Sequence, residues 1–199
     1  MNIKEFIPKK RAFPYVLNDK PSAWGDIPTI LDDLIKTFGI TQRLALEFGV
    51  EYGYSTTALA NYFKVIGVDT FEGDMHAGKV KNHFVETDQR IQSHVYENNL
   101  NLVTLVKSTY QDFIEKRGKH FEPFSVDLIH VDIVHTYEDT FACGDWSLTK
   151  SKAVIFHDTE SFPDVKRACI DLAKKHYMQF YNYKASNGLG IITSHIPII

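Results

Sequence analysis

The stretch from Leu44 to Ala60 limits the possible folds of this chain more than any other segment. It reads L-A-L-E-F-G-V-E-Y-G-Y-S-T-T-A-L-A, an apolar run that meets an acid and two glycines and then becomes helical in pattern. Gly49 allows a sharp turn because it has no Cβ, and Gly53 lets a ligand approach the backbone closely. A hydroxyl at Ser55 or Thr56 can cap the helix that follows. The segment therefore predicts a strand, a turn that binds a nucleoside, and a helix.

Strand-like apolar runs alternate with helical patterns along the chain. The runs are Leu44–Phe48, Val65–Val68, Leu102–Val106, Val126–Val131 and Val154–Phe156. The helical patterns lie near 54–62, 86–97, 109–117 and 137–143, with two further amphipathic helices at Ile27–Phe38 and Phe162–Tyr177. This alternation predicts an α/β fold, a mostly parallel doubly wound sheet with helices on both faces.

Two strands near the end of the chain distinguish between types of sheet. Phe180–Tyr183 and Leu189–Thr193 are joined through Ser186-Asn187-Gly188, a pattern typical of a hairpin. A dinucleotide-binding Rossmann domain usually ends in another parallel strand, whereas the variant that binds S-adenosylmethionine ends in a hairpin whose last strand inserts antiparallel. The pattern favours a mostly parallel Rossmann-like sheet with a C-terminal antiparallel hairpin strand, within a single domain at 27–199. An arm at 1–26 is expected to pack on this body or on a neighbour.

Composition excludes several classes of partner. The 199 residues include 22 Lys plus Arg and 25 Asp plus Glu, and a net charge of -3 gives no field that favours nucleic acid or an anionic membrane. No apolar run approaches the ~18 residues of a membrane span. Cys143 and Cys169 belong to no metal-binding or redox spacing, so we expect them to be core thiols of a cytoplasmic protein.

Polar side chains end the apolar runs of the predicted sheet. They are Glu47, Asp69, Ser108, Asp132 and the pair His157-Asp158. Ligands of a doubly wound sheet bind outside the carboxyl ends of its strands, so these side chains should converge on one crevice. Each acid alone could equally be a helix cap or a surface carboxylate, but their recurrence after successive strands favours a site. Asp69 in particular suits both hydroxyls of a ribose.

The glycine spacing argues against a dinucleotide ligand. A pyrophosphate site uses G-x-G-x-x-G so that helix amides face the phosphates, whereas the pattern here is E-x-G-x-x-x-G. The carboxylate of Glu47 would repel phosphate. It would suit a cationic amino group, such as that of the methionine moiety of S-adenosylmethionine.

At these residues the sequence resembles a known family. E-F-G-V-E-Y-G-Y-S-T at 47–56 resembles motif I of class I S-adenosylmethionine-dependent methyltransferases and is similar to the catechol O-methyltransferase group. V-I-G-V-D-T-F-E-G-D-M-H-A-G at 65–78, V-D-L-I-H-V-D-I-V-H-T-Y-E-D at 126–139 and A-V-I-F-H-D-T at 153–159 are similar to methyltransferase family 24. The resemblance covers about residues 40–175 in order. It implies the methyltransferase fold, with the strand order 3-2-1-4-5-7-6, and S-adenosylmethionine as cofactor.

The resemblance also implies roles for individual residues. Glu47 and Gly49 would line the methionine end, Asp69 would hold the ribose, and residues 108–111 would flank the adenine. The cofactor-binding set that follows is Glu47, Gly49, Gly53, Ser55, Asp69, Thr70, Ser108, Tyr110 and Asp132.

Two departures from the family pattern affect the acceptor side. In metal-dependent relatives, the acid at the position of Asp132 joins the pair after the fifth strand, here His157 and Asp158, in binding a divalent cation. Because Mg²⁺ prefers oxygen ligands, the histidine favours a borderline transition metal or a site without metal. Ile133 stands where relatives usually have glycine, and its branched side chain is expected to narrow the approach to the acceptor pocket.

Asp132, His135 and His157 are the candidate catalytic residues. Either histidine could act as a general base near neutral pH. His135 could instead cap the helix that follows or hydrogen-bond to Asp132.

The remaining histidines carry weaker signals. His130, inside an apolar run, is expected to be a satisfied core histidine. His76 belongs to the family's G-D-x-H-x-G string and fits either a substrate lid or a mobile surface loop. We expect His83, His94 and His120 at the surface.

The chemistry follows from the implied cofactor. Methyl transfer from a sulfonium is an in-line displacement, in which positioning supplies most of the acceleration and proton removal helps a hydroxyl nucleophile. The prediction is O-methylation of a small hydroxylated or sugar-like metabolite. Two alternatives stay open: a non-catalytic or repurposed nucleoside-binding member of the fold and, with less support, an NAD-dependent oxidoreductase. A homodimer built on the aromatic arm or the hairpin edge also stays open.

Overall fold

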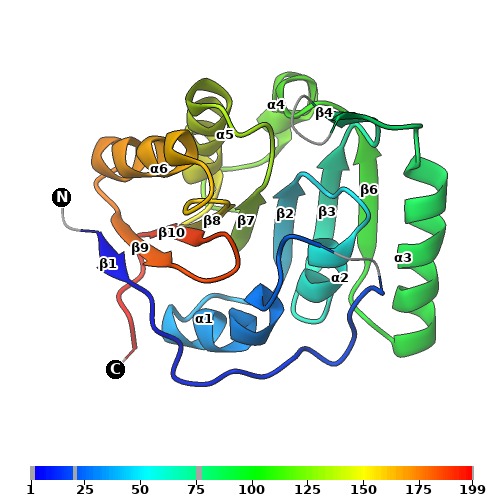
Figure 1. Ribbon diagram of the computed structural model, residues 1–199, viewed down its shortest axis with the longest axis horizontal. Helices are drawn as coiled ribbons and strands as arrows, with labels where there is room; N and C mark the ends of the chain where they lie inside the picture. The colour runs from blue at the N-terminus through cyan, green and yellow to red at the C-terminus, as the bar shows by residue number, and fades with distance from the viewer. Residues whose placement is uncertain (1–2, 20–21, 75–77, 199) are drawn as a thin grey trace.

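The protein is built around an eight-stranded sheet with the strand order β1-β9-β10-β8-β7-β2-β3-β6 (Figure 1). The computed structural model describes residues 3–19, 22–74 and 78–198. The strands of the sheet are β1 Lys4–Glu5, β2 Leu44–Phe48, β3 Lys64–Asp69, β6 Val103–Lys107, β7 Leu128–Val131, β8 Ala153–His157, β9 Gln179–Tyr183 and β10 Leu189–Thr193. From β6 to β9, this is the predicted order 3-2-1-4-5-7-6, with β1 added at the edge.

The last strand inserts antiparallel, as predicted. β10 pairs antiparallel with both β8 and β9, while β2, β3, β6, β7 and β8 pair in parallel. The turn between β9 and β10 uses three consecutive left-handed residues, Ser186, Asn187 and Gly188, with φ of 52°, 64° and 92°. Asparagine and glycine adopt this conformation more readily than other residues, which explains why the turn could be predicted from this tripeptide.

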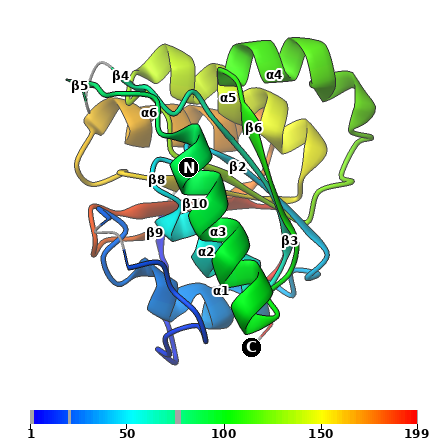
Figure 2. The same cartoon turned by 90° about the vertical axis from the view of Figure 1, so that its right-hand side faces the viewer.

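Helices cover both faces of the sheet (Figures 1 and 2). They are α1 Leu31–Thr37, which continues the 3-10 turn η1 Ile27–Ile30, α2 Tyr54–Ala60, α3 Phe84–Asn98, α4 Tyr110–Arg117 followed by η2 Gly118–His120, α5 Tyr137–Lys150 and α6 Pro163–Lys175. Successive strand residues point to opposite faces, so Ala45 packs in the core beneath α1, α2 and α3, and Leu46 packs in the core beneath α4, α5 and α6. Burial on both faces explains the continuous apolar runs in the sequence.

Three features differ from the sequence prediction. Helix α5 continues to Lys150 rather than ending at 143, because Gly144 does not break it. A Cβ at Gly144 would lie 2.5 Å from Leu172 Cδ1, so this glycine allows α5 to pack closely against α6. The pair β4 Gly73–Asp74 and β5 Gly78–Lys79 forms a short antiparallel ladder that is too brief to show periodicity in the sequence. Strand β1 escaped notice for the same reason.

The N-terminal arm lies against the domain at both of its ends. Lys4 and Glu5 pair in parallel with β9, and Trp24 is buried in the core, whereas Phe13 and Tyr15 between them are exposed. The prediction that Cys143 and Cys169 are core thiols is confirmed, since both are buried and free. Within the described residues, none of the helices combines the length and the apolar character needed to cross a membrane.

Candidate active site

A cavity of about 580 Å³ lies at the carboxyl ends of the parallel strands. Nine of the predicted site residues line it: Gly49, Asp69, Thr70, Ser108, Tyr110, Asp132, His135, His157 and Asp158. The wall also includes Ser22 and Ala23 from the arm, Glu51 and Tyr52 from the glycine turn, Ile133, and His83. Glu47, Gly53 and Ser55 are not among the lining residues. The crevice expected from the strand ends is therefore present, but three members of the predicted set lie behind its surface.

Gly49 brings two strand ends into contact. It has a φ of 92°, and a Cβ built on it would lie only 1.6 Å from the carbonyl oxygen of Asp132. Gly53 also has a positive φ, of 84°, and its missing side chain makes room for Ile91 of α3. The first glycine thus shapes the cavity floor, while the second serves helix packing.

The predicted helix cap is wrong. The N-cap residue of α2 is Gly53, and no side chain caps the helix. Ser55 is buried within the first turn, and the hydroxyl of Thr56 donates to Glu47 Oε2. Thr56 lies within the helix, after the N-cap position, and its hydroxyl is engaged by Glu47 rather than by a backbone amide of the helix start.

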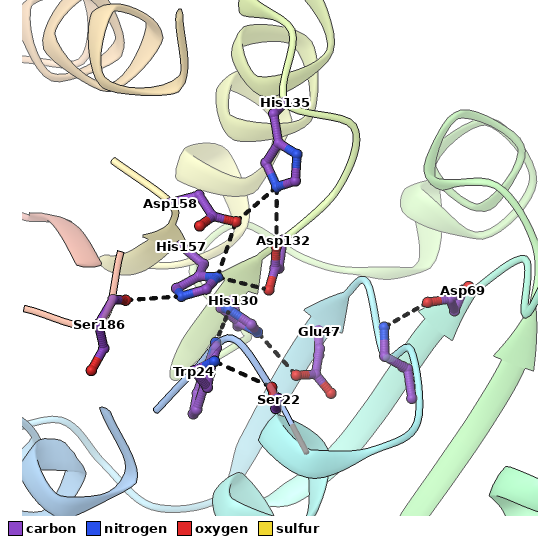
Figure 3. A network of polar contacts seen from close by, with 11 residues as sticks. Ser22, Trp24, Glu47, Asp69, His130, Asp132, His135, His157, Asp158 and Ser186 are labelled. Atoms are coloured by element: carbon purple, nitrogen blue, oxygen red, sulfur yellow. Dashed lines mark hydrogen bonds and ion pairs between the residues drawn. The ribbon is translucent and has the colours of Figure 1, made fainter. Parts of the chain in front are cut away.

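Glu47 is completely buried beneath the cavity and bonds to His130. The Nδ1 atom of His130 lies 2.9 Å from Glu47 Oε1, and the indole Nε1–H of Trp24 donates to His130 Nε2 at 3.3 Å (Figure 3). His130 is fully buried, as predicted, and both ring nitrogens are engaged. The prediction that Glu47 faces the crevice does not fit this arrangement.

Asp69 organises the glycine turn. Its Oδ2 accepts hydrogen bonds from the amides of Val50 and Glu51, both at 2.8 Å, and its Oδ1 accepts from the amide of Phe71 at 2.6 Å. A carboxylate offers about four lone-pair sites. Asp69 can therefore hold the turn and still accept a hydrogen bond from a ligand hydroxyl in the cavity.

A hydrogen bond joins the part of the cavity wall that follows β6 to the part that follows β7. Thr109 caps α4, because its Oγ1 accepts from the amide of Asp112 at 3.1 Å. The hydroxyl of Tyr110 donates to Asp139 Oδ1 at 2.8 Å. Burial, and then this bond to Asp139, raise the pKa of Tyr110, so it remains a neutral phenol.

Two aspartates and two histidines form a compact cluster at the ends of β7 and β8 (Figure 3). His157 Nδ1 lies 3.2 Å from Asp132 Oδ2 and 3.2 Å from Asp158 Oδ2. His135 Nε2 lies 2.8 Å from Asp158 Oδ2 and 3.7 Å from Asp132 Oδ1. The other nitrogen of His157, Nε2, lies 3.2 Å from the carbonyl oxygen of Ser186, to which it can only donate.

The carboxylates keep both histidines protonated. Burial alone would lower the pKa of each imidazole, but Asp132 and Asp158 outweigh it and raise the pKa of His157 to about 10 and that of His135 to about 9. Burial would raise the pKa of both carboxyls, yet the histidines hold those pKa values below their usual range. The expectation that His135 accepts a proton near neutral pH does not fit this raised pKa.

His135 also does not cap the next helix. Thr136 is the N-cap of α5, since its Oγ1 accepts from the amide of Asp139 at 3.1 Å. The imidazole of His135 stacks on the ring of Phe162 instead, with centroids 4.1 Å apart and an interplanar angle of 7°. This stacking holds the ring at the mouth of the acid–histidine cluster.

The cluster predicts how stability depends on pH. The stabilisation from the two histidines is complete below their unfolded pKa of 6.5 and is lost as pH rises through about 9 and about 10. The stabilisation from the two carboxyls is complete above 3.8 and is lost as pH falls through their lowered pKa values. We therefore expect the melting temperature to decline between pH 6.5 and 10, and His157→Asn to flatten that decline. Thermal melts across this range test it, with the exposed His120→Asn as a matched control that keeps the original slope.

His83 is one of the lining residues, with Glu51 and Asp139, that were not predicted as part of the site. It was expected at the surface but is buried, with its ring stacked on Tyr52 at 4.4 Å and its Nδ1 3.0 Å from Thr87 Oγ1. Burial lowers its pKa. The Thr87 spacing of four residues at a helix start was the one available signal. Of the other histidines, His120 is exposed, His94 is half-buried, and His76 lies outside the described residues.

A cation could be held by a set that differs by one residue from the predicted one. Asp132, His135 and Asp158 each offer a ligand atom, and these atoms lie within 4.8 Å of one another. His157, predicted as a ligand, points one nitrogen at Ser186 and the other at the two carboxylates. Two carboxylate oxygens and one imidazole suit a first-row transition metal better than Mg²⁺.

The sequence and the fold are similar to those of known methyltransferases. A family model described as a methyltransferase domain matches residues 46–159. A Streptococcus mutans protein described as a methyltransferase and solved in complex with SAH has a TM-score of 0.54 at 13% identity, covering 78% of this chain and 92% of that one. SAH-bound methyltransferase PaMTH1 of Podospora anserina has a TM-score of 0.53 at 12% identity, with coverage of 76% and 71%.

Two further matches carry other descriptions: one is an rRNA methylase, and the other is an uncharacterized protein. An rRNA methylase from Streptococcus thermophilus has a TM-score of 0.54 at 12% identity, covering 85% of this chain and 96% of that one. The uncharacterized protein y4gI of Sinorhizobium fredii is 30% identical over 128 residues, which are 59% of this chain. The matched part spans only 13% of the length of y4gI. At these identities the solved structures establish a shared fold.

Proposed function

The chain belongs to the methyltransferase-domain family, and on that premise we propose that it binds S-adenosylmethionine in the cavity and transfers the methyl group to a hydroxyl of a small molecule. The charge of the cavity wall carries this proposal. Five carboxylates line the cavity, from Glu51, Asp69, Asp132, Asp139 and Asp158, and its described lining includes no lysine or arginine. A ligand with a sulfonium and an ammonium group suits such a wall, whereas a pyrophosphate does not.

The order of the strands supports one orientation of the cofactor. Asp69 ends β3 and would accept from a ribose hydroxyl, and Ser108 to Gln111 follow β6 on the outer side. The adenine would lie toward β6. The methionine half would then extend the other way, toward β2 and β7, where Gly49 and Asp132 meet. This orientation directs the sulfonium toward the acid–histidine cluster.

The absence of lysine and arginine from the described lining also favours a small acceptor over a nucleic acid. A polynucleotide acceptor needs lysine and arginine for its phosphates, and the net charge of -3 supplies no compensating field. An acceptor hydroxyl can hydrogen-bond to Asp132 or Asp158 instead. A hydroxylated or sugar-like metabolite fits this chemistry, with Ile133 as an apolar wall.

The proposed reaction is a single displacement. The bond from the acceptor oxygen to the methyl carbon forms as the bond from sulfur breaks, and the hydroxyl proton passes to the acid–histidine cluster. Asp132, His135 and His157 are the proposed catalytic residues, with His135 in its deprotonated form as the base. A divalent cation held by Asp132, His135 and Asp158 would polarise the acceptor hydroxyl when bound.

Ligand-induced stabilisation tests the cofactor. Saturating S-adenosylhomocysteine should raise the melting temperature by about 5 to 10 °C, and NAD should leave it unchanged. Asp69→Asn should weaken the binding of S-adenosylhomocysteine about 30-fold, because it removes the charge from the acceptor of a ribose hydroxyl. Asp164→Asn, exposed on α6, is the matched control. Stabilisation by NAD alone would contradict the proposal.

Transfer of a labelled methyl group tests the reaction itself. S-adenosylmethionine labelled on the methyl group is incubated with a panel of hydroxylated and sugar metabolites and, separately, with ribosomal RNA. Label in a small molecule supports the proposal, and label in RNA alone overturns the acceptor class. Cofactor binding without label in any acceptor would favour the non-catalytic alternative.

A further inference from the structure

Four buried side chains form a continuous hydrogen-bonded chain beneath the cavity: Trp24, His130, Glu47 and Thr56. Figure 3 shows the links from Trp24 through His130 to Glu47. None of them is more than 1% exposed. They come from four separate parts of the fold, namely the arm, β7, β2 and the first turn of α2. The proposed reaction uses none of them directly.

The donors and acceptors among these four side chains define where the proton of His130 lies. The indole of Trp24 can only donate, so His130 Nε2 must accept and carry no proton. In the neutral imidazole the proton then sits on Nδ1, where it is donated to Glu47 Oε1 at 2.9 Å. The other oxygen of Glu47 accepts from Thr56. Each donor therefore has one acceptor, and neither oxygen of Glu47 is left to face the cavity.

The chain of bonds ends at the arm, next to the cavity. Ser22 and Ala23, just before Trp24, line the cavity, and the hydroxyl of Ser22 accepts from the amide of Trp24 at 3.2 Å. On the opposite side, Glu47 lies two residues before Gly49, the glycine that touches Asp132. Trp24 and His130 therefore fix the distance between two walls of the cavity, one formed by the arm and the other by the glycine turn.

We infer that Trp24 and His130 are positioning residues for the methionine half of the cofactor. This inference rests on the proposed function, which places that half toward β2 and β7, where Gly49 and Asp132 meet, in the cavity that Ser22 and Ala23 of the arm also line. The two residues act through the backbone they anchor and touch no reacting atom. Glu47 serves in this chain as the acceptor that fixes the His130 ring, rather than as a direct ligand of the amino group.

A pair of nucleoside probes separates this role from a general effect on folding. S-adenosylhomocysteine contains the amino-acid half, and 5′-methylthioadenosine lacks it while keeping the nucleoside and the sulfur. Trp24→Phe keeps the aromatic packing but removes the N–H donor. We expect it to weaken S-adenosylhomocysteine about 10-fold and to change the affinity for 5′-methylthioadenosine less than twofold, by calorimetry.

Two further variants complete the design. His130→Asn keeps a donor for Glu47 but is too short to reach Trp24, so it should reproduce the selective loss. The double variant should be no weaker than either single one, because both changes break the same link. Tyr15→Phe, an exposed change in the same arm, should alter neither affinity.

The outcomes are distinct. An equal loss for both probes, additive losses in the double variant, or unchanged binding in Trp24→Phe overturns the inference. So does a nitrogen NMR spectrum of the unaltered protein with the His130 proton on Nε2, a test that needs no variant to fold. Failure of the unaltered protein to bind S-adenosylhomocysteine would overturn the proposed function, and this inference with it.

Discussion

Replacing Gly49 by alanine is expected to abolish measurable binding of S-adenosylhomocysteine, with a loss of at least about 100-fold. The added Cβ would lie 1.6 Å from the carbonyl oxygen of Asp132, a distance at which the backbone must move. The φ of 92° adds strain for any side chain. Overpacking and strain together should lower the free energy of unfolding by about 3 kcal/mol. Calorimetric titration below the melting temperature, together with a thermal melt, measures both effects.

A second glycine separates backbone strain from damage to the site. Gly39 also has a positive φ, of 58°, but the neighbour of its missing Cβ is the flexible end of Ile198 at 3.2 Å. Gly39→Ala should therefore cost about 1 kcal/mol of stability and leave the affinity for S-adenosylhomocysteine intact. Binding by Gly49→Ala within threefold of the unaltered protein would show that contact between the ends of β2 and β7 does not shape the cofactor site.

The order of the sheet could be predicted because local signals agreed with the global fold. Inner strands that are buried on both faces appear as mostly apolar runs, as Val154–Phe156 does within β8. The acids that end these runs lie at one edge of the sheet, so Asp69, Asp132 and Asp158 meet the same cavity. The hairpin could be predicted because its turn needs left-handed residues, and Asn187 and Gly188 are of the types that adopt this conformation readily.

The partners of individual side chains could not be predicted in the same way. Glu47 shares its strand face with Ala45 and turns toward His130, which lies 83 residues away in sequence. Trp24 reaches the same histidine across 106 residues. No periodicity or spacing rule connects such positions, because the contact exists only once β2 and β7 are paired. The raised pKa values of His135 and His157 likewise depend on carboxylates that lie far away in sequence, Asp158 beside His135 and Asp132 beside His157.

Asp132→Asn is expected to lower the plateau rate of methyl transfer about 100-fold while changing the affinity for S-adenosylhomocysteine less than threefold, since positioned acid–base groups contribute on that scale.

In the unaltered protein, treated with a chelator, the rate should rise with pH and level off near the His135 pKa of about 9, because only the deprotonated imidazole can accept the hydroxyl proton. Asparagine removes one of the two charges that raise this pKa, so the variant should level off at a lower pH. An inflection at the same pH in both proteins would remove His135 as the base. Activity that returns only when Mn²⁺ is added would assign the activation of the hydroxyl to a cation at Asp132, His135 and Asp158.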